Sequence, residues 1–225
     1  MQAALFDLDD TLLDRSGSLR DFATWQAEGM LSASVKNKQH FADRFITLDQ
    51  NGMVWKDQVY KSLIDEFDLV DWTVDELLTV YVLTFCAFCK PRDGALNAIE
   101  EFHRNGFKIG LVTNGKTPFQ ERNFKALGFS ELFDCVVVSE AVGLRKPDKA
   151  IFELACHKMD VGAGSSVFIG DSPVADMEGA KKAGMTTIYV PVDRQYTPCT
   201  HADSTYKNLS DLSGYVDREV KRIGR

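Results

Sequence analysis

Residues 3–12 read Ala-Ala-Leu-Phe-Asp-Leu-Asp-Asp-Thr-Leu, an apolar run that ends in a cluster of acids. The apolar half is typical of a strand buried on both faces of a parallel sheet, because such strands lose the alternation of polar and apolar residues. Aspartate is a poor strand former and an unpaired buried carboxylate is costly, so the strand should end at Asp7. The sequence therefore predicts that Asp7 and Asp9 lie together at the rim of a buried sheet. Two acids at that place form either a turn or a catalytic and metal site.

The composition is that of a globular protein. Hydrophobic residues make up 44% of the 225 residues and charged residues 26%, so we expect no extensive disorder. The chain carries 26 basic and 33 acidic residues, a net charge of −7. This balance argues against nonspecific binding to a nucleic acid polymer, which needs a basic surface. A small anion can still bind, because a local metal ion and one lysine reverse the sign of the field.

The sequence shows no targeting or membrane segment. No signal-peptide pattern precedes the first strand. The longest apolar segment, Leu77–Cys89, is interrupted by threonines and is too short to span a bilayer. We therefore expect a cytoplasmic protein with no membrane partner.

The five cysteines fit a reducing compartment. Cys86 and Cys89 form a C-x-x-C pair, and Cys199 and His201 could in principle complete a zinc site. We interpret the pair as small core residues, because the two signals are weak and the pair lies in an apolar helical pattern.

The order of elements predicts an α/β core with a helical insertion. The pattern becomes helical after Thr11 and stays so to about Lys90, with Thr73 a plausible N-cap and enough length for a small helical bundle. From Pro91 onward strands alternate with helices, which indicates a parallel sheet covered on both faces. After the first strand, the expected strands are 107–112, 135–138, 167–169 and 187–190, and the expected helices are 95–105, 118–127, one from about 147 and one ending at 182. The core would comprise residues 1–13 and 92–225, and the insertion residues 14–91.

Polar side chains follow four of these strands, at the point where each strand ends. They are Asp7 and Asp9, Thr113 and Asn114, Ser139, and Asp171. In open α/β sheets the ligand crevice lies outside those ends, so we expect these groups to converge. Each motif alone has an ordinary explanation as a helix cap or turn, and Lys146 alone would be a solvated loop lysine. The shared position of all of them favours one site.

The ordered set resembles the four motifs of the haloacid dehalogenase-like (HAD) hydrolases. The motifs are Asp7-Leu8-Asp9-Asp10-Thr11, Thr113-Asn114, Lys146-Pro147, and Gly170-Asp171 with Asp176. The resemblance covers nearly the whole predicted core, and the insertion is similar to the helical C1 cap of subfamily I. It implies a Rossmann-like parallel sheet with strand order 5-4-1-2-3 and a small inserted α-helical cap domain. The motifs are specific for the superfamily and poorly specific for the substrate.

The resemblance also implies a metal-dependent nucleophilic mechanism. Asp7 would attack phosphorus and form an aspartyl-phosphate. Mg²⁺ prefers oxygen ligands and would be held by the Asp7 carboxylate, the Asp9 backbone carbonyl and the Asp171 carboxylate. Asp176 would orient a metal-bound water or the lysine.

Asp9 narrows the expected reaction to phosphate chemistry. In the family it would protonate the departing alkoxide and then activate water. Dehalogenases of this superfamily lack an acid at this position, because a halide needs no proton. The Thr113 hydroxyl, the Asn114 backbone N–H and Lys146 would bind the phosphoryl oxygens.

The motifs are similar to the branch that includes pyrimidine 5′-nucleotidases and N-acylneuraminate phosphatases. We therefore expect the substrate to be a small phosphorylated metabolite, a nucleoside monophosphate or a sugar phosphate. The motifs do not fix the oligomeric state, and a monomer or a homodimer is expected. The cap would close and supply specificity. Its candidate contacts, each equally explained by solvation or packing, are Arg15, Arg20, Trp25, Lys36, Lys38, His40 and Arg44, with Lys116 and Phe119 from the core. The alternatives are a phosphomutase like β-phosphoglucomutase and a noncatalytic protein of the same fold that binds a phosphorylated ligand.

Overall fold

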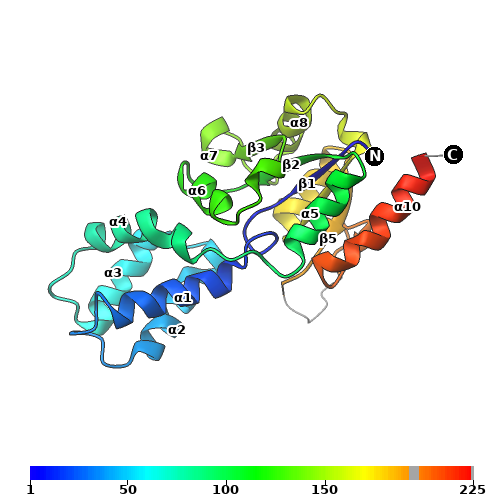
Figure 1. Cartoon of the computed structure of the whole chain (residues 1–225). Helices are drawn as coiled ribbons and strands as arrows, with labels where there is room; N and C mark the ends of the chain where they lie inside the picture. Colours follow the sequence, from blue (N-terminus) through cyan, green and yellow to red (C-terminus); the bar gives the residue numbers. More distant parts are fainter. Residues whose placement is uncertain (193–197, 224–225) are drawn as a thin grey trace. The chain divides into compact units, whose positions relative to one another are not determined.

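The computed structural model describes residues 1–192 and 198–223, and the chain folds into two compact units (Figure 1). One unit combines Met1–Leu13 with Pro91–Arg225, and the other is Asp14–Lys90. Leu13 forms an isolated bridge with Pro91, so the chain leaves the first unit and returns to it at neighbouring positions. A segment inserted between these two residues therefore leaves the sheet of the first unit continuous.

The first unit is built on a parallel six-stranded sheet with the order β3-β2-β1-β4-β5-β6. The strands are β1 (Ala3–Phe6), β2 (Lys108–Thr113), β3 (Cys135–Val138), β4 (Ser166–Gly170), β5 (Thr186–Tyr189) and β6 (Ser204–Thr205). The predicted order of the first five strands is confirmed, and their ends agree with the prediction to within one residue. The sixth strand was not expected, because two hydroxyl residues give no apolar run.

The helices of this unit connect the strands, except α10, which follows β6. They are α5 (Ala95–Arg104), α6 (Phe119–Ala126), α7 (Ser139–Val142), α8 (Lys149–Lys158), α9 (Gly179–Lys182) and α10 (Ser213–Ile223). Two of them, α7 and α10, were not predicted. The first is a single turn, too short to show a helical period. The second carries Val216, Val220 and Ile223 at helical spacing in the sequence, a signal that the sequence reasoning missed.

Both faces of β1 are covered, and this explains its unbroken apolar sequence. Leu5 packs in one cluster with Phe152 of α8 and Phe168 of β4. Phe6 points to the other face, where its ring meets that of Phe102 of α5 edge-on at a centroid distance of 5.8 Å. On that face α5 lies beside α10 (Figure 1). The expectation of a sheet covered on both faces is confirmed.

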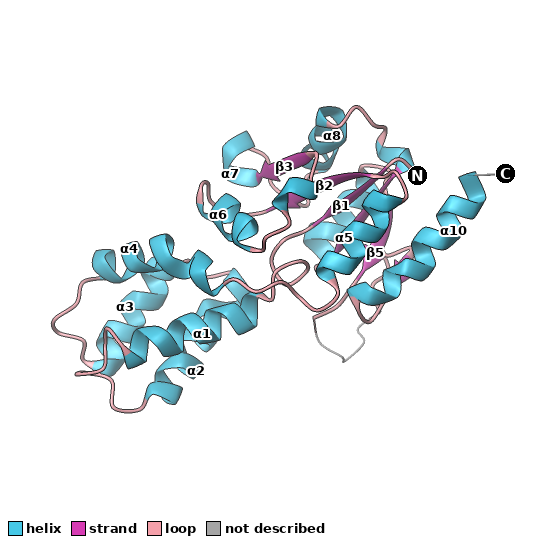
Figure 2. Cartoon of the chain, viewed as in Figure 1, coloured by secondary structure: helices cyan, strands magenta, loops and turns pink. Residues whose placement is uncertain are grey.

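The second unit contains helices and loops only (Figure 2). Its helices are α1 (Arg15–Glu28), α2 (Lys38–Asp49), α3 (Lys56–Phe67) and α4 (Val74–Thr84), and a short 3₁₀ turn, Phe85–Phe88, follows. Phe22 is fully buried at the centre, with its ring 6.2 Å from that of Phe45 and 5.3 Å from that of Tyr81. Thr73 caps α4 as predicted, because its hydroxyl accepts the Glu76 backbone N–H and its own N–H donates to the Glu76 carboxylate.

Arg15 has a structural position rather than one open to a ligand. It is buried and forms a two-bond ion pair with Asp49, at 2.7 and 2.9 Å, and Lys56 also binds this carboxylate. A buried cation needs such a partner, since an unpaired charge in the interior is strongly destabilising. Of the explanations that the sequence left open for Arg15, the structure favours packing over a substrate contact.

Cys86 and Cys89 also differ from their prediction. They lie half-buried in and just after the 3₁₀ turn Phe85–Phe88 rather than in the core, because the helical pattern tightens there before Pro91. No helix within the described ranges combines the length and apolarity that crossing a membrane requires.

Candidate active site

The carboxyl end of β1 is flanked by the carboxyl ends of β2 and β4. Phe6 is paired with Leu111 of β2 and with Ile169 of β4. Asp7 comes next and donates its backbone N–H to the Ile169 carbonyl at 3.0 Å. Because the three strands are parallel, the loops that carry the predicted site residues leave from one edge of the sheet.

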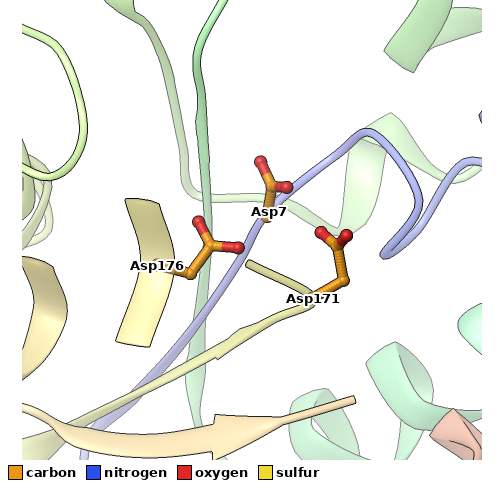
Figure 3. A group of neighbouring side chains, drawn as sticks. All are labelled: Asp7, Asp171 and Asp176. Atoms are coloured by element: carbon orange, nitrogen blue, oxygen red, sulfur yellow. The ribbon is translucent and has the colours of Figure 1, made fainter. Parts of the chain in front are cut away.

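Asp7, Asp171 and Asp176 each bring a carboxylate oxygen to within 4.8 Å of the others (Figure 3). In Figure 3 Asp7 comes from the segment after β1 and Asp171 from just beyond β4, and their carboxyl groups gather with that of Asp176. Asp7 is 7% exposed and Asp176 is completely buried. Within the part of the chain that the structure describes, this is the one group of acidic, histidine or cysteine side chains with the spacing of a metal site.

Lys146 lies inside this group of carboxylates. Its side chain is 2% exposed, and its Nζ is 2.6 Å from Asp7 Oδ1 and 2.6 Å from Asp176 Oδ1. Lys146 is therefore no solvated loop lysine, the explanation that its motif would have if taken alone. Burial alone favours the neutral amine, but the carboxylates of Asp176 and Asp7 outweigh it and raise the pKa of Lys146 above its usual range.

Asn114 holds the backbone of Lys146 in place. Its Nδ2 donates to the Lys146 carbonyl at 3.0 Å, and its Oδ1 accepts the Lys146 N–H at 2.9 Å. These reciprocal bonds tie the loop before α8 to the end of β2. The Asn114 side chain therefore positions the backbone of Lys146, a role that the sequence did not predict.

The carboxylates outnumber the cation that pairs with them. Burial raises the pKa of Asp7 well above its usual range; Lys146 opposes this increase, and Asp176 and Asp171 add to it. Burial, together with Asp176 and Asp10, raises the pKa of Asp171 to about 7. With all groups ionised, three carboxylates and one ammonium would carry a formal charge of −2. Oxygen ligands with this charge fit a hard divalent cation such as Mg²⁺.

The turn after β4 fixes both oxygens of Asp176. Ser172 donates its backbone N–H to Asp176 Oδ2 at 3.0 Å, while Oδ1 accepts from Lys146. Asp176 lies in a π-helical turn, Pro173–Glu178, a geometry that is frequent at functional sites. A Cβ atom on Gly170 would lie 2.4 Å from Asp176 Oδ2, so only glycine leaves room for this carboxylate.

The loop after β1 is held by groups from distant parts of the sequence. The Leu8 carbonyl accepts three backbone N–H groups, at 2.9 to 3.2 Å, and Asp10 has a φ of 58°. The Thr11 hydroxyl donates to Asp171 Oδ1 at 3.3 Å. Arg92 donates to the Asp10 carbonyl at 2.6 Å and, through its other nitrogen, to a carbonyl just after β5. The sequence reasoning missed Arg92, whose signal is its position directly after the helical insertion.

Asp9 and Thr113 share one partner. Gln120 Nε2 donates to Asp9 Oδ2 at 2.8 Å and to Thr113 Oγ1 at 2.9 Å. Gln120 is 3% exposed in the first turn of α6. The sequence reasoning missed it, because a glutamine in a helix is ordinarily solvated and carries no motif.

Residues 1–184 match the family described as haloacid dehalogenase-like hydrolase. The chain belongs to this family. It is 26% identical to a glyceraldehyde 3-phosphate phosphatase of Methanocaldococcus jannaschii, over 96% of this chain and 97% of that protein. It is 27% identical to a pyrimidine 5′-nucleotidase of Escherichia coli, over 86% of this chain and 87% of the relative. The crystal structure of a HAD phosphatase from Thermococcus onnurineus is similar with a TM-score of 0.69 and 26% identity, over 96% of this chain and 98% of that one.

The predicted family and the α/β fold are thereby confirmed, and the chain is an enzyme of the HAD hydrolase family. In this HAD hydrolase the predicted site residues lie in two connected groups. The first is Asp7, Lys146, Asp171 and Asp176, with Asn114 behind the lysine, and the second is Asp9 and Thr113, which Gln120 joins. The catalytic roles of these residues, and the Asp9 carbonyl as a metal ligand, stay predictions.

Proposed function

We propose that this HAD hydrolase is a Mg²⁺-dependent cytoplasmic phosphatase that hydrolyses a small phosphomonoester through an aspartyl-phosphate at Asp7. One observation carries the proposal. The buried ammonium of Lys146 bridges Asp7 and Asp176, and Asp171 lies within 4.8 Å of both carboxylates. This arrangement combines a nucleophile, a fixed cation for the phosphoryl group and an unbalanced negative charge that suits a divalent metal.

The metal would be held by the carboxylates of Asp7 and Asp171 and by the Asp9 backbone carbonyl. Asp176 is better suited to hold Lys146, since both of its oxygens accept hydrogen bonds from the protein. When bound, Mg²⁺ supplies positive charge to the phosphoryl oxygens and favours the ionised form of its carboxylate ligands.

In the first step a carboxylate oxygen of Asp7 forms a bond to phosphorus while the bond from phosphorus to the substrate oxygen breaks. Asp9 gives its proton to that oxygen, so an alcohol leaves rather than an alkoxide. Lys146, Thr113 and the Asn114 N–H would bind the equatorial oxygens, where negative charge is spread in the transition state.

In the second step water replaces the alcohol. The ionised Asp9 takes a proton from the water as its oxygen bonds to phosphorus. The bond between phosphorus and the Asp7 oxygen breaks, inorganic phosphate leaves, and Asp7 is again a carboxylate. The lysine would keep its charge throughout, because Asp176 stays a carboxylate and the bound phosphoryl group supplies negative charge while Asp7 is esterified.

The relatives support the proposed substrate class. One similar protein is named for glyceraldehyde 3-phosphate and another for pyrimidine 5′-nucleotides. We propose a nucleoside monophosphate or sugar phosphate, with the helical unit Asp14–Lys90 acting as a C1 cap that supplies specificity.

A panel of phosphorylated metabolites, scored by released phosphate with Mg²⁺ and with a chelator, tests the proposal. We expect at least one nucleotide or sugar phosphate to be hydrolysed, and chelation to lower the rate by at least about 100-fold, since a metal supplies several kcal/mol of charge stabilisation. Phosphate release should equal substrate loss. Isomerisation without release of phosphate would instead indicate a phosphomutase. Inactivity on the whole panel, both with and without Mg²⁺, would contradict the proposed phosphatase function.

Replacing Asp171 tests the metal site independently of turnover. Between about pH 4 and pH 7 the unfolded chain ionises this carboxyl while the folded protein keeps it protonated, so its contribution to stability falls as pH rises through the folded pKa of about 7. Metal-free Asp171→Asn should therefore gain stability relative to the parent as pH rises from about 4 to about 7 and keep that gain above pH 7, with roughly 2–4 °C in Tm for each 1 kcal/mol.

The same variant should lose most of the rise in Tm that Mg²⁺ produces in the parent. At about 100 times Kd that rise corresponds to about 2.7 kcal/mol. Glu131→Gln, which removes an exposed carboxylate in the same unit, serves as the control and should keep the full response. An equal Mg²⁺ response in Asp171→Asn and the control would exclude Asp171 as a ligand.

A further inference from the structure

Gln120 occupies a position between two groups of the proposed reaction. Its Nε2 is 2.8 Å from Asp9 Oδ2, 2.9 Å from Thr113 Oγ1 and 3.4 Å from the Asn114 carbonyl. Its side chain comes from the first turn of α6 and is almost completely buried. A buried amide with partners in two site loops has a fixed direction, because an unmade hydrogen bond there is costly.

The orientation of the Gln120 amide follows from its neighbours. A carboxylate and a backbone carbonyl can only accept, so the NH₂ group faces Asp9 and Asn114. The carbonyl oxygen of the amide faces the other way, 3.5 Å from Asn123 Nδ2. With Asp9 ionised, the reverse orientation would set the amide oxygen 2.8 Å from a carboxylate oxygen and 3.4 Å from the Asn114 carbonyl oxygen, and both contacts would be repulsive.

These bonds have consequences for both partners. The NH₂ group has two hydrogens, and its two shorter contacts use one each, on Asp9 and on Thr113. Thr113 Oγ1 accepts a bond, so its own hydrogen points away from the amide and can be donated to a phosphoryl oxygen. Asp9 is held at Oδ2, which orients Oδ1 for proton exchange with the substrate.

The Gln120 side chain occupies the space that a side chain at position 115 would need. A Cβ atom on Gly115 would lie 2.5 Å from Gln120 Cγ and 2.8 Å from its Cδ. Gly115 is not among the residues with positive φ, so its backbone does not require glycine. The close approach of the Gln120 side chain is thus the reason that residue 115 lacks a side chain.

We propose that Gln120 is a positioning residue that orients the Asp9 carboxyl and the Thr113 hydroxyl toward the phosphoryl group. The absence of a side chain at Gly115 leaves room for the Gln120 side chain to do so. The proposal rests on the phosphatase function proposed above. Asp9 matters most when the leaving group is a poor one, because an alkoxide needs a proton and a nitrophenolate does not. Misplacing Asp9 should therefore penalise alkyl phosphates far more than aryl phosphates.

The test compares Gln120→Met with the parent, with Mg²⁺ present, on an alkyl phosphomonoester from the panel and on p-nitrophenyl phosphate. The kinetic constant is kcat/KM, which reports the steps up to departure of the alcohol and so excludes hydrolysis of the intermediate. We expect a loss of about 10- to 100-fold on the alkyl ester and less than about 5-fold on the aryl ester, since small misplacements of a catalytic group cost up to about 100-fold.

Gly115→Ala should also displace the Gln120 side chain, because the added Cβ would lie 2.5 Å from Gln120 Cγ, while the Gln120 amide itself is kept. It should reproduce the change in the alkyl-to-aryl ratio, and its effect should not add to that of Gln120→Met in the double variant, because the two act through one contact. Phe124→Leu is the matched control. It lies on the same helix, α6, and its ring packs on Phe133 ahead of β3, 4.7 Å between centroids, so the variant should lower Tm and leave the ratio unchanged.

An unchanged ratio in Gln120→Met, with the parent active on both esters, would overturn the positioning role and leave the phosphatase function intact. The same shift in Phe124→Leu would assign the effect to general loosening of α6 and would also overturn it. A parent protein inactive on both esters would overturn the proposed function, and the role of Gln120 with it.

Discussion

Asp7→Asn should abolish phosphatase turnover, with a loss of at least about 10⁴-fold in kcat, as is typical when a covalent nucleophile is removed. The amide oxygen of asparagine can still accept the 2.6 Å bond from Lys146, so the arrangement of the site should persist. The free energy of unfolding of the metal-free variant should equal or exceed that of the parent, because one of three clustered carboxylates is neutralised.

Asp10→Asn is the matched control for this prediction. It changes the same residue type in the same loop, and asparagine tolerates the φ of 58° at position 10. We expect its kcat to stay within about tenfold of the parent value, because its side chain has no assigned part in the reaction.

Acid quenching during turnover tests for the intermediate directly. The quenched parent protein should carry a covalent phosphoryl group, and Asp7→Asn should carry none. Normal turnover in Asp7→Asn would exclude the aspartyl-phosphate mechanism.

Lys146→Met should lose both activity and stability. The ammonium pairs with two carboxylates, and its removal leaves Asp7 and Asp176 buried without compensation. Breaking a buried ion pair by removing one partner typically costs about 3–5 kcal/mol. Turnover should fall by at least about 100-fold, since the phosphoryl oxygens lose their fixed cation. Urea unfolding in the presence of a chelator measures the stability without the metal.

A double variant and a control variant separate the effect of the Lys146 charge on stability from the effect of its packing. Lys146→Met with Asp176→Asn should regain part of the lost stability, because one uncompensated carboxylate is gone, and should remain inactive. Lys149→Met removes an exposed lysine whose partner is Glu153, so it should change stability by less than about 0.5 kcal/mol. A Lys146→Met protein as stable as the parent would contradict the buried ion-pair network.

The agreement between the sequence predictions and the structure is greatest where the signal is local. An apolar run followed by acids predicted both β1 and the position of Asp7, because the length and burial of a strand depend on the hydrophobicity of consecutive residues. The capping box at Thr73 is local in the same way. The short strand β6 and the single-turn helix α7 escaped prediction, since they are held by neighbours rather than by their own composition.

Other features depend on residues far apart in the chain. Arg15, a candidate for substrate contact in the sequence, is buried against Asp49, 34 residues away. Gln120 reaches Asp9 across 111 residues, and no motif marks it. Burial and partner together give these side chains their roles, and neither can be read from a residue's own surroundings in the sequence.

The sequence by itself determined the parallel α/β core, the strand ends at which the site residues stand and the family to which the chain belongs. These follow from local hydrophobicity, turn residues and short motifs. Only the tertiary structure decided that Lys146 is buried between Asp7 and Asp176, that Asp171 has a pKa of about 7, and that one amide joins Asp9 to Thr113. The physical reason is that charge interactions and hydrogen bonds depend on distance and solvent exclusion, which arise when parallel strands bring distant loops to one edge of the sheet.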